Sequence, residues 1–238
     1  MIIISIYYCT LEFYKLISKD LNIYFIDVGQ GDSTLIVSPN NRVILIDGGG
    51  SGDINKYDIG DKLLVPYLLD RGISRIDYML VSHFDSDHSE GLLAVMKNLK
   101  VDCIIISMQS EISNEYKDFI SVANVKKIEI KVVEKGDRIS IEKNIYIDIL
   151  YPEKDLRFGD LNNNSIVAKL VYNSFSMLFV GDIEREAESQ IVDRYGDSNK
   201  LRSTVLKVAH HRFKNINYRR IFRKNKAQNC ISWSRRRQ

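Results

Sequence analysis

The chain has 238 residues, of which 45% are hydrophobic and 27% charged, and this composition is typical of a globular protein and excludes a largely disordered one. A chain of this length buries a substantial core, most simply as one large domain, and its three cysteines form no CxxC pair, which excludes a disulfide framework or a zinc knuckle. The formal net charge of +3 is unevenly distributed: residues 212–238 hold ten of the 34 basic side chains and none of the 31 acidic ones, which leaves −7 (24 basic minus 31 acidic) on residues 1–211.

The first half of the chain is predicted to begin as a strand meander and to continue with alternating helices and strands. Glycine-rich and proline-containing turns at Gly29–Asp32 and Pro39–Asn41 separate the first apolar runs. Leucines at helical spacing before Gly72 predict a helix, in which Pro66 would introduce a kink. The strands expected here are Leu21–Val28, Thr34–Ser38, Val43–Ile46 and Ile76–Val81, and the helices are Asp61–Arg71 and His88–Leu99.

The second half repeats this mixture of elements, with a hairpin turn at Asn173–Ser174. Strands are predicted at Cys103–Ser107, Lys127–Val133, Arg138–Ile141, Ile145–Tyr151, Ser165–Tyr172, Phe175–Val180 and Thr204–Ala209, and helices at Ser113–Ala123 and Ile183–Tyr195. This order predicts an α+β fold in which two mixed sheets pack together with helices outside.

The run S-H-F-D-S-D-H at Ser82–His88 is the segment that packing explains least well. It places two imidazoles and two carboxylates within six positions directly after an apolar strand, and this is a ligand set for divalent metals. Because alternate positions of an extended turn point to the same side, His83 and Asp85 can face one ion while Asp87 and His88 reach a second. The alternative is a solvated polar loop.

Other ligand-type side chains also follow predicted strands. Asp182 comes after a strand at a sharp turn made by Gly181, and Asp47 comes after another strand and before three glycines. His210 and His211 follow the last predicted strand, so all four histidines lie at strand ends. The same arrangement thus recurs four times, and Asp182 is a natural bridging ligand.

These motifs carry a family resemblance. The Asp47 segment LIDGG, the HxDxDH run, the GD pair and the segment KVAHH occur in an order that resembles the metallo-β-lactamase superfamily of dinuclear metallohydrolases. FIDVGQGDS, NNNS and LFVGDIE more closely resemble the soluble hydrolase domain of ComEC-type DNA-uptake proteins. The resemblance covers roughly residues 21–211 and implies one hydrolase domain with the αββα sandwich fold, here expected to lack its last strands.

The resemblance also implies a site with two divalent ions, which lower the pKa of a bound water to about 7 and clamp the oxygens of an in-line displacement. His83 and Asp85 would hold one ion, the other would have Asp87, His88 and one of the late histidines, and Asp182 would lie between them. His210 is preferred over His211. The implied metal ligands are His83, Asp85, Asp87, His88, Asp182 and His210, with Asp87 and Asp182 as the catalytic residues.

The resemblance also implies which metal is favoured and which residues surround the ligands. Asp47 is expected to accept a hydrogen bond from a ligand histidine and so to fix its tautomer. No histidine lies between His88 and His210, so the first ion has mainly oxygen ligands, which favours Mn²⁺ or Mg²⁺ over Zn²⁺. Further residues that can line the site, with capping and turn roles as the alternative, are Asp32, Asn163, Asn164, Ser165 and His211.

Both ends of the chain depart from this pattern. Residues 1–20 form an apolar leader that contains Glu12 and Lys15, falls short of the roughly 20 uncharged residues of a membrane span, and makes a poor signal peptide. We interpret it either as the remnant of a membrane-spanning region, such as adjoins the hydrolase domain in ComEC-type proteins, or as a surface-packed leader. The chain is expected to be membrane-associated only in the context of that family and otherwise soluble.

The basic tail at residues 212–238 is the second departure. Members of the family follow the histidine pair with Gly-Ser, a helix and closing strands, whereas here the pair runs into Arg212–Lys214. One hypothesis is a frameshifted or truncated end, which translation of the coding DNA in the other two frames would test. The competing hypothesis is a basic arm that binds nucleic acid phosphates without sequence preference.

The sequence therefore predicts a metal-dependent phosphodiesterase or nuclease that acts on DNA during competence-type DNA uptake. The partners implied are DNA, bound through its phosphates, and a membrane channel component of the uptake system. Two alternatives stay open: a metallohydrolase of a small ester, lactone or phosphonate, and an inactive truncated product that binds polyanions through its tail.

Overall fold

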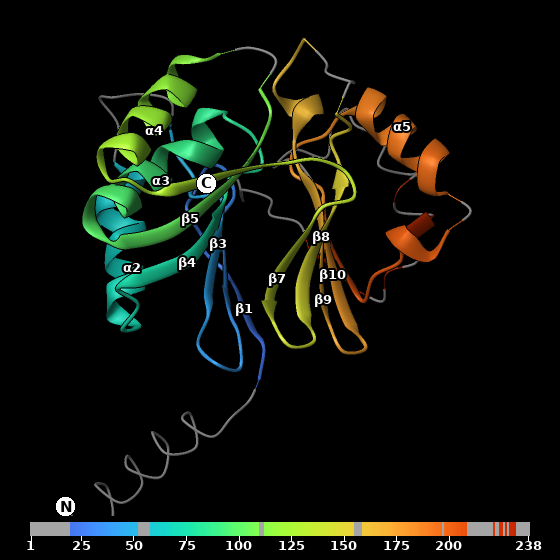
Figure 1. Ribbon diagram of the computed structural model, residues 1–238, viewed down its shortest axis with the longest axis horizontal. Coiled ribbons are helices and arrows are strands. Elements are labelled where there is room, and N and C mark those ends of the chain that lie inside the picture. The colour runs from blue at the N-terminus through green and yellow to red at the C-terminus, as the bar shows by residue number, and fades with distance from the viewer. Residues whose placement is uncertain are drawn as a thin grey trace, which may run out of the picture.

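The computed structural model describes residues 20–51, 58–109, 112–154, 159–196 and 198–208, together with residues 221, 224, 225, 227 and 229–231. These described residues form two six-stranded sheets that pack face to face, with helices on the outer side of each (Figure 1). The predicted α+β architecture of two mixed sheets flanked by helices is thus confirmed. The predicted leader, apart from Asp20, and most of the basic tail lie outside the described residues.

The first sheet consists, in spatial order, of β1 (Asn22–Phe25), β2 (Thr34–Val37), β3 (Val43–Ile46), β4 (Arg75–Leu80), β5 (Lys100–Ser107) and β6 (Glu129–Val133). The pairs β1–β2 and β2–β3 are antiparallel, whereas β3 to β6 are parallel. Parallel strands end at the same edge of a sheet, so the segments that follow β3, β4 and β5 lie side by side.

The second sheet consists, in spatial order, of β12 (Asn229–Ile231), β11 (Val205–Lys207), β10 (Phe175–Phe179), β9 (Val167–Tyr172), β8 (Ile145–Tyr151) and β7 (Arg138–Glu142). The strands β7 to β10 are antiparallel, whereas β11 pairs parallel with both β10 and β12. Since β12 belongs to the basic tail, the expectation that no strand follows the histidine pair is wrong for these three residues.

The helices lie where apolar periodicity predicted them, with local differences. The first sheet is covered by the π-helical turn η1 (Gly60–Leu64), α2 (Val65–Asp70), α3 (Ser86–Asn98) and α4 (Asn114–Val125), and the second by α5 (Arg185–Tyr195). Instead of a kink, the wider turn η1 precedes Pro66, which lacks the N–H for a regular helical bond. None of the described helices is long and apolar enough to cross a lipid bilayer.

The strand β3 shows how the layers are held together. All four of its residues are buried because both faces of the sheet are covered. Leu45 packs toward the helices with Leu92 of α3, whereas Ile44 and Ile46 pack against the second sheet. A third apolar cluster joins the second sheet to α5. Each fully buried aliphatic side chain contributes about 1.5–3 kcal/mol, so these layers fix the strand ends relative to one another.

Candidate metal centre

The side chains of the candidate site leave the two sheets at neighbouring strand ends. Asp47 follows β3, His83 follows β4, and His88 lies in the first turns of α3. Asp182 follows β10 of the other sheet, and the backbone N–H of Ile166 donates to the carbonyl of Ser82 at 2.9 Å, which ties the sheets together here. The site therefore depends on the packing of both sheets.

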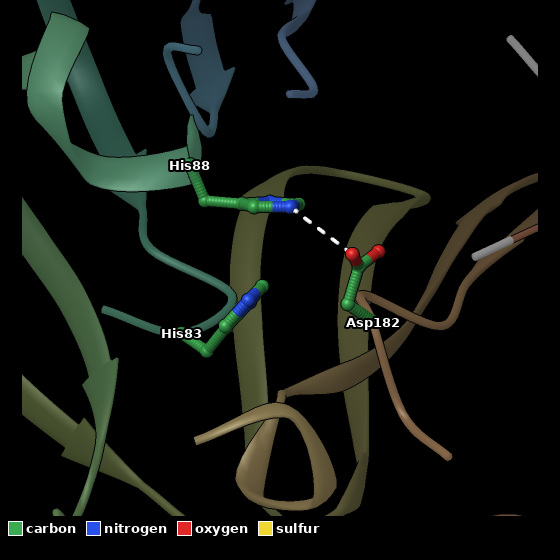
Figure 2. A group of neighbouring side chains, drawn as sticks. All are labelled: His83, His88 and Asp182. Carbon is green, nitrogen blue, oxygen red and sulfur yellow. Dashed lines mark ion pairs between the residues drawn. The ribbon is translucent and has the colours of Figure 1, made fainter. Parts of the chain in front are cut away.

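His83, His88 and Asp182 point into one common space (Figure 2). All three are buried, and one ligand atom from each lies within 4.8 Å of the other two. The two imidazole centroids are 4.2 Å apart, and Nε2 of His88 lies 3.4 Å from Oδ2 of Asp182. This is a compact set of two nitrogen donors and one oxygen donor.

Asp47 lies behind the imidazole of His88. Its Oδ2 is 3.0 Å from Nδ1 of His88 and accepts a 2.7 Å hydrogen bond from the hydroxyl of Ser82. Its Oδ1 accepts from the backbone N–H of Ser82 at 2.8 Å. These bonds hold Asp47 in left-handed backbone geometry (φ 57°), a region that aspartate tolerates better than most residues. The predicted hydrogen bond from a ligand histidine to Asp47 corresponds to this contact with Nδ1 of His88, and the role itself stays a prediction.

Two groups at the site have shifted pKa values. Burial opposes the charged form of His88, but Asp182 and Asp47 outweigh it and raise the pKa of His88 well above its ordinary value of 6.5. The contact with His83 lowers the pKa of Asp85 below its ordinary value of 3.8, so Asp85 is ionised at neutral pH. The site therefore concentrates charge that a divalent cation would neutralise.

The donor set fits a divalent metal. Nε2 of His83 is buried and has no hydrogen-bond partner among the described residues. A buried polar atom in this state is costly, whereas an imidazole nitrogen beside a carboxylate is a normal metal ligand. The sequence assigned His83 and His88 to two different ions with Asp182 between them, and the structure brings ligand atoms of all three within 4.8 Å of one another.

Among the described residues, the other predicted ligands do not belong to the compact group formed by His83, His88 and Asp182. Asp85 is the residue before α3, and its partly exposed carboxylate lies 3.5 Å from Nε2 of His83. The helix begins at Ser86, so the extended turn predicted through His88 is wrong from there on, because the apolar face of α3 packs against the first sheet. Asp87 is partly exposed in the first turn, and His210 and His211 lie outside the described residues.

Asp32 has a partner that sequence reasoning missed. Its carboxylate forms a buried ion pair with Nζ of Lys207, which belongs to β11. Both side chains line a small interior cavity together with Asp47, Ser82 and Gly181. The one available signal was a lysine inside an otherwise apolar strand. The pair connects the loop after β1 to the second sheet directly beside the candidate centre.

The NNNS segment mainly organises the backbone around α5. Oδ1 of Asn163 accepts hydrogen bonds from the N–H groups of Glu184 and Ala187, at 2.9 and 3.2 Å, and so caps the helix. Nδ2 of Asn164 donates to the carbonyl of Asp160 at 2.6 Å. Ser165 is closer to the centre, because its hydroxyl accepts from the N–H of Asp182 at 3.2 Å.

Two glycines allow the loops to approach α3 closely. A Cβ atom on Gly31, which has φ +85°, would lie 1.5 Å from the carbonyl oxygen of Asp87, and one on Gly50 would lie 2.0 Å from that of Ser86. Any side chain there would displace the first turn of α3. The glycine-rich loops thus position the helix that carries His88.

Comparison with known proteins agrees with this geometry. ComE operon protein 3 of Bacillus subtilis (strain 168) is 28% identical over 217 residues, which is 85% of this chain and 27% of the relative. Competence protein ComA of Neisseria gonorrhoeae is 31% identical over 190 residues, 78% of this chain and 23% of the relative. The chain thus spans about a quarter of the length of the curated relatives it matches. Both relatives agree with the resemblance to competence proteins inferred from the motifs.

Among solved structures, the fold is similar to that of CmlA, a diiron β-hydroxylase from Streptomyces venezuelae. The TM-score is 0.50 at 14% identity, over 87% of this chain and 37% of that one, and the likeness concerns the fold alone. Residues 26–214 match the family model described as the metallo-beta-lactamase superfamily. The chain therefore belongs to the metallo-β-lactamase superfamily.

Proposed function

We propose that the chain is a metal-dependent phosphodiesterase that cleaves DNA. The observation that carries the proposal is the convergence of His83, His88 and Asp182, with ligand atoms within 4.8 Å of one another, in a member of a hydrolase superfamily. Relatives named as a competence protein and as a ComE operon protein support DNA as the substrate. Uptake of DNA through a membrane channel component is the cellular setting we propose.

The proposed site holds two divalent ions. His83 with Asp85 would bind one and His88 with Asp87 the other, joined by a late histidine, with Asp182 between the ions. Bound ions of this kind lower the pKa of a water molecule to about 7 and stabilise the charge of a phosphate in displacement. We favour Mn²⁺ or Mg²⁺ over Zn²⁺ because the ion at His83 and Asp85 would have a single imidazole ligand and otherwise oxygen ligands.

The protein side chains would bind these ions, orient one another and exclude water from the site. His83 and His88 close the inner side of the site, because their exposed fractions are 1% and 0%. Asp47 orients His88, and the partly exposed Asp85 marks the side of the site that is open to solvent. Because the proposed ions would engage the reacting phosphate, we propose that DNA is recognised through its phosphates and without sequence preference.

The basic tail supports attraction of a polyanion. Its ten Lys and Arg residues contrast with the net charge of −7 on the rest of the chain. Binding through such a segment releases counterions and therefore weakens as salt concentration rises. Steep salt dependence of DNA binding, together with cleavage that needs the metal centre, would separate the two contributions.

The test measures metal content and cleavage of supercoiled and single-stranded DNA by the purified chain with Mn²⁺, Mg²⁺ or Zn²⁺. We expect His83→Ala and Asp182→Ala to lose metal and to lower cleavage by at least about 100-fold. Asp148→Ala is the matched control, because it removes a carboxylate on β8 that pairs with Arg138 at the surface. Equal cleavage by all variants would contradict the proposal.

A chromogenic phosphodiester and small ester, lactone and phosphonate substrates distinguish the alternative hydrolase classes. Turnover of these substrates with no cleavage of either DNA form would replace DNA by a small substrate. DNA binding without metal uptake or turnover would instead support an inactive product that binds polyanions.

A further inference from the structure

The hydroxyl of Ser82 lies at the centre of the hydrogen bonds behind the candidate metal site. Its Oγ is 2.7 Å from Oδ2 of Asp47, 3.0 Å from Nδ1 of His83 and 3.4 Å from Nδ1 of His88. Ser82 is 2% exposed, so these three neighbours decide the direction of its one proton.

The proton of Ser82 points to Asp47. An ionised carboxylate can only accept, and 2.7 Å is the normal length of an O–H···O hydrogen bond. If the hydroxyl were turned away, an oxygen lone pair would face the Asp47 charge at this distance in a buried place. Ser82 is therefore a donor to Asp47 and has only lone pairs to offer to the histidines.

The direction of this bond assigns the proton of a neutral His83. With the hydroxyl proton committed to Asp47, the 3.0 Å contact to Nδ1 is favourable only if Nδ1 carries a hydrogen. The competing acceptor is Asp85, whose Oδ2 lies 3.5 Å from Nε2, beyond good hydrogen-bond length. The Asp85 side chain is 41% exposed and can turn toward solvent, whereas Ser82 is enclosed.

The two histidines are therefore held in the same way by one carboxylate. Asp47 contacts Nδ1 of His88 directly at 3.0 Å, and it reaches Nδ1 of His83 through the hydroxyl of Ser82. In both rings the Nδ1 side faces Asp47 and Ser82. Nε2 of His88 then lies 3.4 Å from Oδ2 of Asp182, and Nε2 of His83 has no hydrogen-bond partner among the described residues. Figure 2 shows the two rings beside Asp182.

We propose that Ser82 is a positioning residue that holds His83 as the Nδ1–H tautomer, so that the Nε2 lone pair is presented to a divalent metal. The link to metal binding rests on the proposed function, which it deepens by naming the group that prepares one ligand. The proton assignment itself is a property of the metal-free protein.

The first experiment reads the tautomer directly. Long-range ¹H–¹⁵N correlation spectra of the ¹⁵N-labelled, metal-free chain, taken where His83 is neutral, report which ring nitrogen carries the hydrogen. We expect a protonated Nδ1 and a bare Nε2. A His83 with its proton on Nε2 in the unsubstituted chain would overturn the inference, and this result needs no variant to fold.

The second experiment measures Mn²⁺ affinity by calorimetry. Loss of an outer hydrogen-bond partner commonly weakens metal binding by about 10–100-fold, and we expect this for Ser82→Ala together with a shift of the His83 proton toward Nε2. Ser82→Thr keeps the hydroxyl and should return both readouts to within a few-fold of the original. Unchanged affinity and an unchanged tautomer in Ser82→Ala would also overturn the inference.

Ser107→Ala is the matched control. It removes another buried hydroxyl, at the end of the adjacent strand β5, which donates to the carbonyl of Asn164 and accepts from Nε2 of Gln109 but contacts no histidine of the described part of the chain. It should leave both readouts unchanged, and an effect equal to that of Ser82→Ala would assign the loss to general destabilisation. If the unsubstituted chain binds no Mn²⁺, the proposed function fails, while the spectra still decide the position of the His83 proton.

Discussion

Lys207 and Asp32 form a buried ion pair that joins the second sheet to the loop after β1, across 175 positions of sequence. Asp32 also accepts, through its backbone carbonyl, a hydrogen bond from Gly49 at 2.9 Å, so the pair is continuous with the glycine-rich loop that follows β3. The ion pair thus supports the loops on which α3 rests.

We expect Lys207→Met to destabilise the fold by about 3–5 kcal/mol in urea unfolding, because it leaves the Asp32 carboxylate buried without its cation. The double variant Lys207→Met, Asp32→Asn removes both charges and should lose clearly less. Arg75→Met, which breaks a half-exposed pair with Asp102, is the control and should cost less than about 1 kcal/mol. A double variant no more stable than Lys207→Met would contradict this reading.

The raised pKa of His88 predicts a dependence of stability on pH. Because the folded-state pKa lies above the unfolded value of about 6.5, the stabilisation is complete below that value and is lost as pH rises through the folded pKa. If His88 holds a divalent ion through Nε2, the ion would take the place of the proton, so saturating Mn²⁺ should abolish this alkaline loss.

Urea unfolding from about pH 6 to about pH 9, with chelator or with Mn²⁺, measures this difference. The affinity for Mn²⁺ should rise over the same range, since the proton and the metal compete for His88. Stability of the chelated protein that increases with pH would show that the carboxylates around His88 do not hold its proton.

Asn163 can be tested as a structural residue. We expect Asn163→Ala to destabilise the fold by about 1–2 kcal/mol, because the N–H groups of Glu184 and Ala187 lose their acceptor, and to leave Mn²⁺ affinity unchanged. Asn162→Ala, which removes a single 3.2 Å bond to Glu184, is the neighbouring control. A loss of Mn²⁺ affinity without loss of stability would instead place Asn163 at the site.

Gly31 and Gly29 form a matched pair for the contact between loop and helix. Both have positive φ, +85° and +76°, so an alanine at either is strained by about 1–2 kcal/mol. A Cβ on Gly29 meets nothing within 4 Å, whereas one on Gly31 meets the carbonyl of Asp87 at 1.5 Å. Gly31→Ala should therefore be much less stable than Gly29→Ala in thermal unfolding, and equal stabilities would contradict the close approach.

Most of the fold could be predicted because the local sequence pattern of most elements agrees with the structure that they adopt. The strands Val43–Ile46 and Ile145–Tyr151 were predicted with the bounds that the structure has, since apolar runs there end at turn residues. The start of α3 could not be predicted, because Ser86 and Asp87 are polar and the helix begins there only when its later apolar face packs on the first sheet. The short strand β12 lacks alternation and forms by pairing with β11.

The site could be predicted in its ligand types but not in its supporting contacts. Imidazoles and carboxylates at strand ends are visible in sequence, and the structure brings His83, His88 and Asp182 together. The hydrogen bond from Ser82 to Asp47 joins residues 35 positions apart. In the sequence, Ser82 looks like any serine at the end of a strand, because its partner becomes visible only when the two strands pair. Lys207 stands out in its apolar strand, but its pairing with Asp32 could not be predicted, because the partner is defined only when the two sheets pack.

The strands β3, β4, β5 and β10 end at the same side of the sandwich, and the residues that follow them differ in their exposure. Asp47, His83 and Asp182 follow their strands within the first three positions, where the sheets dictate direction, whereas Met108, directly after β5, is exposed. Because Asp47 and His83 start from the first sheet and Asp182 from the second, a shift of one sheet against the other would pull these side chains apart, and the candidate centre therefore reports on the integrity of the whole sandwich.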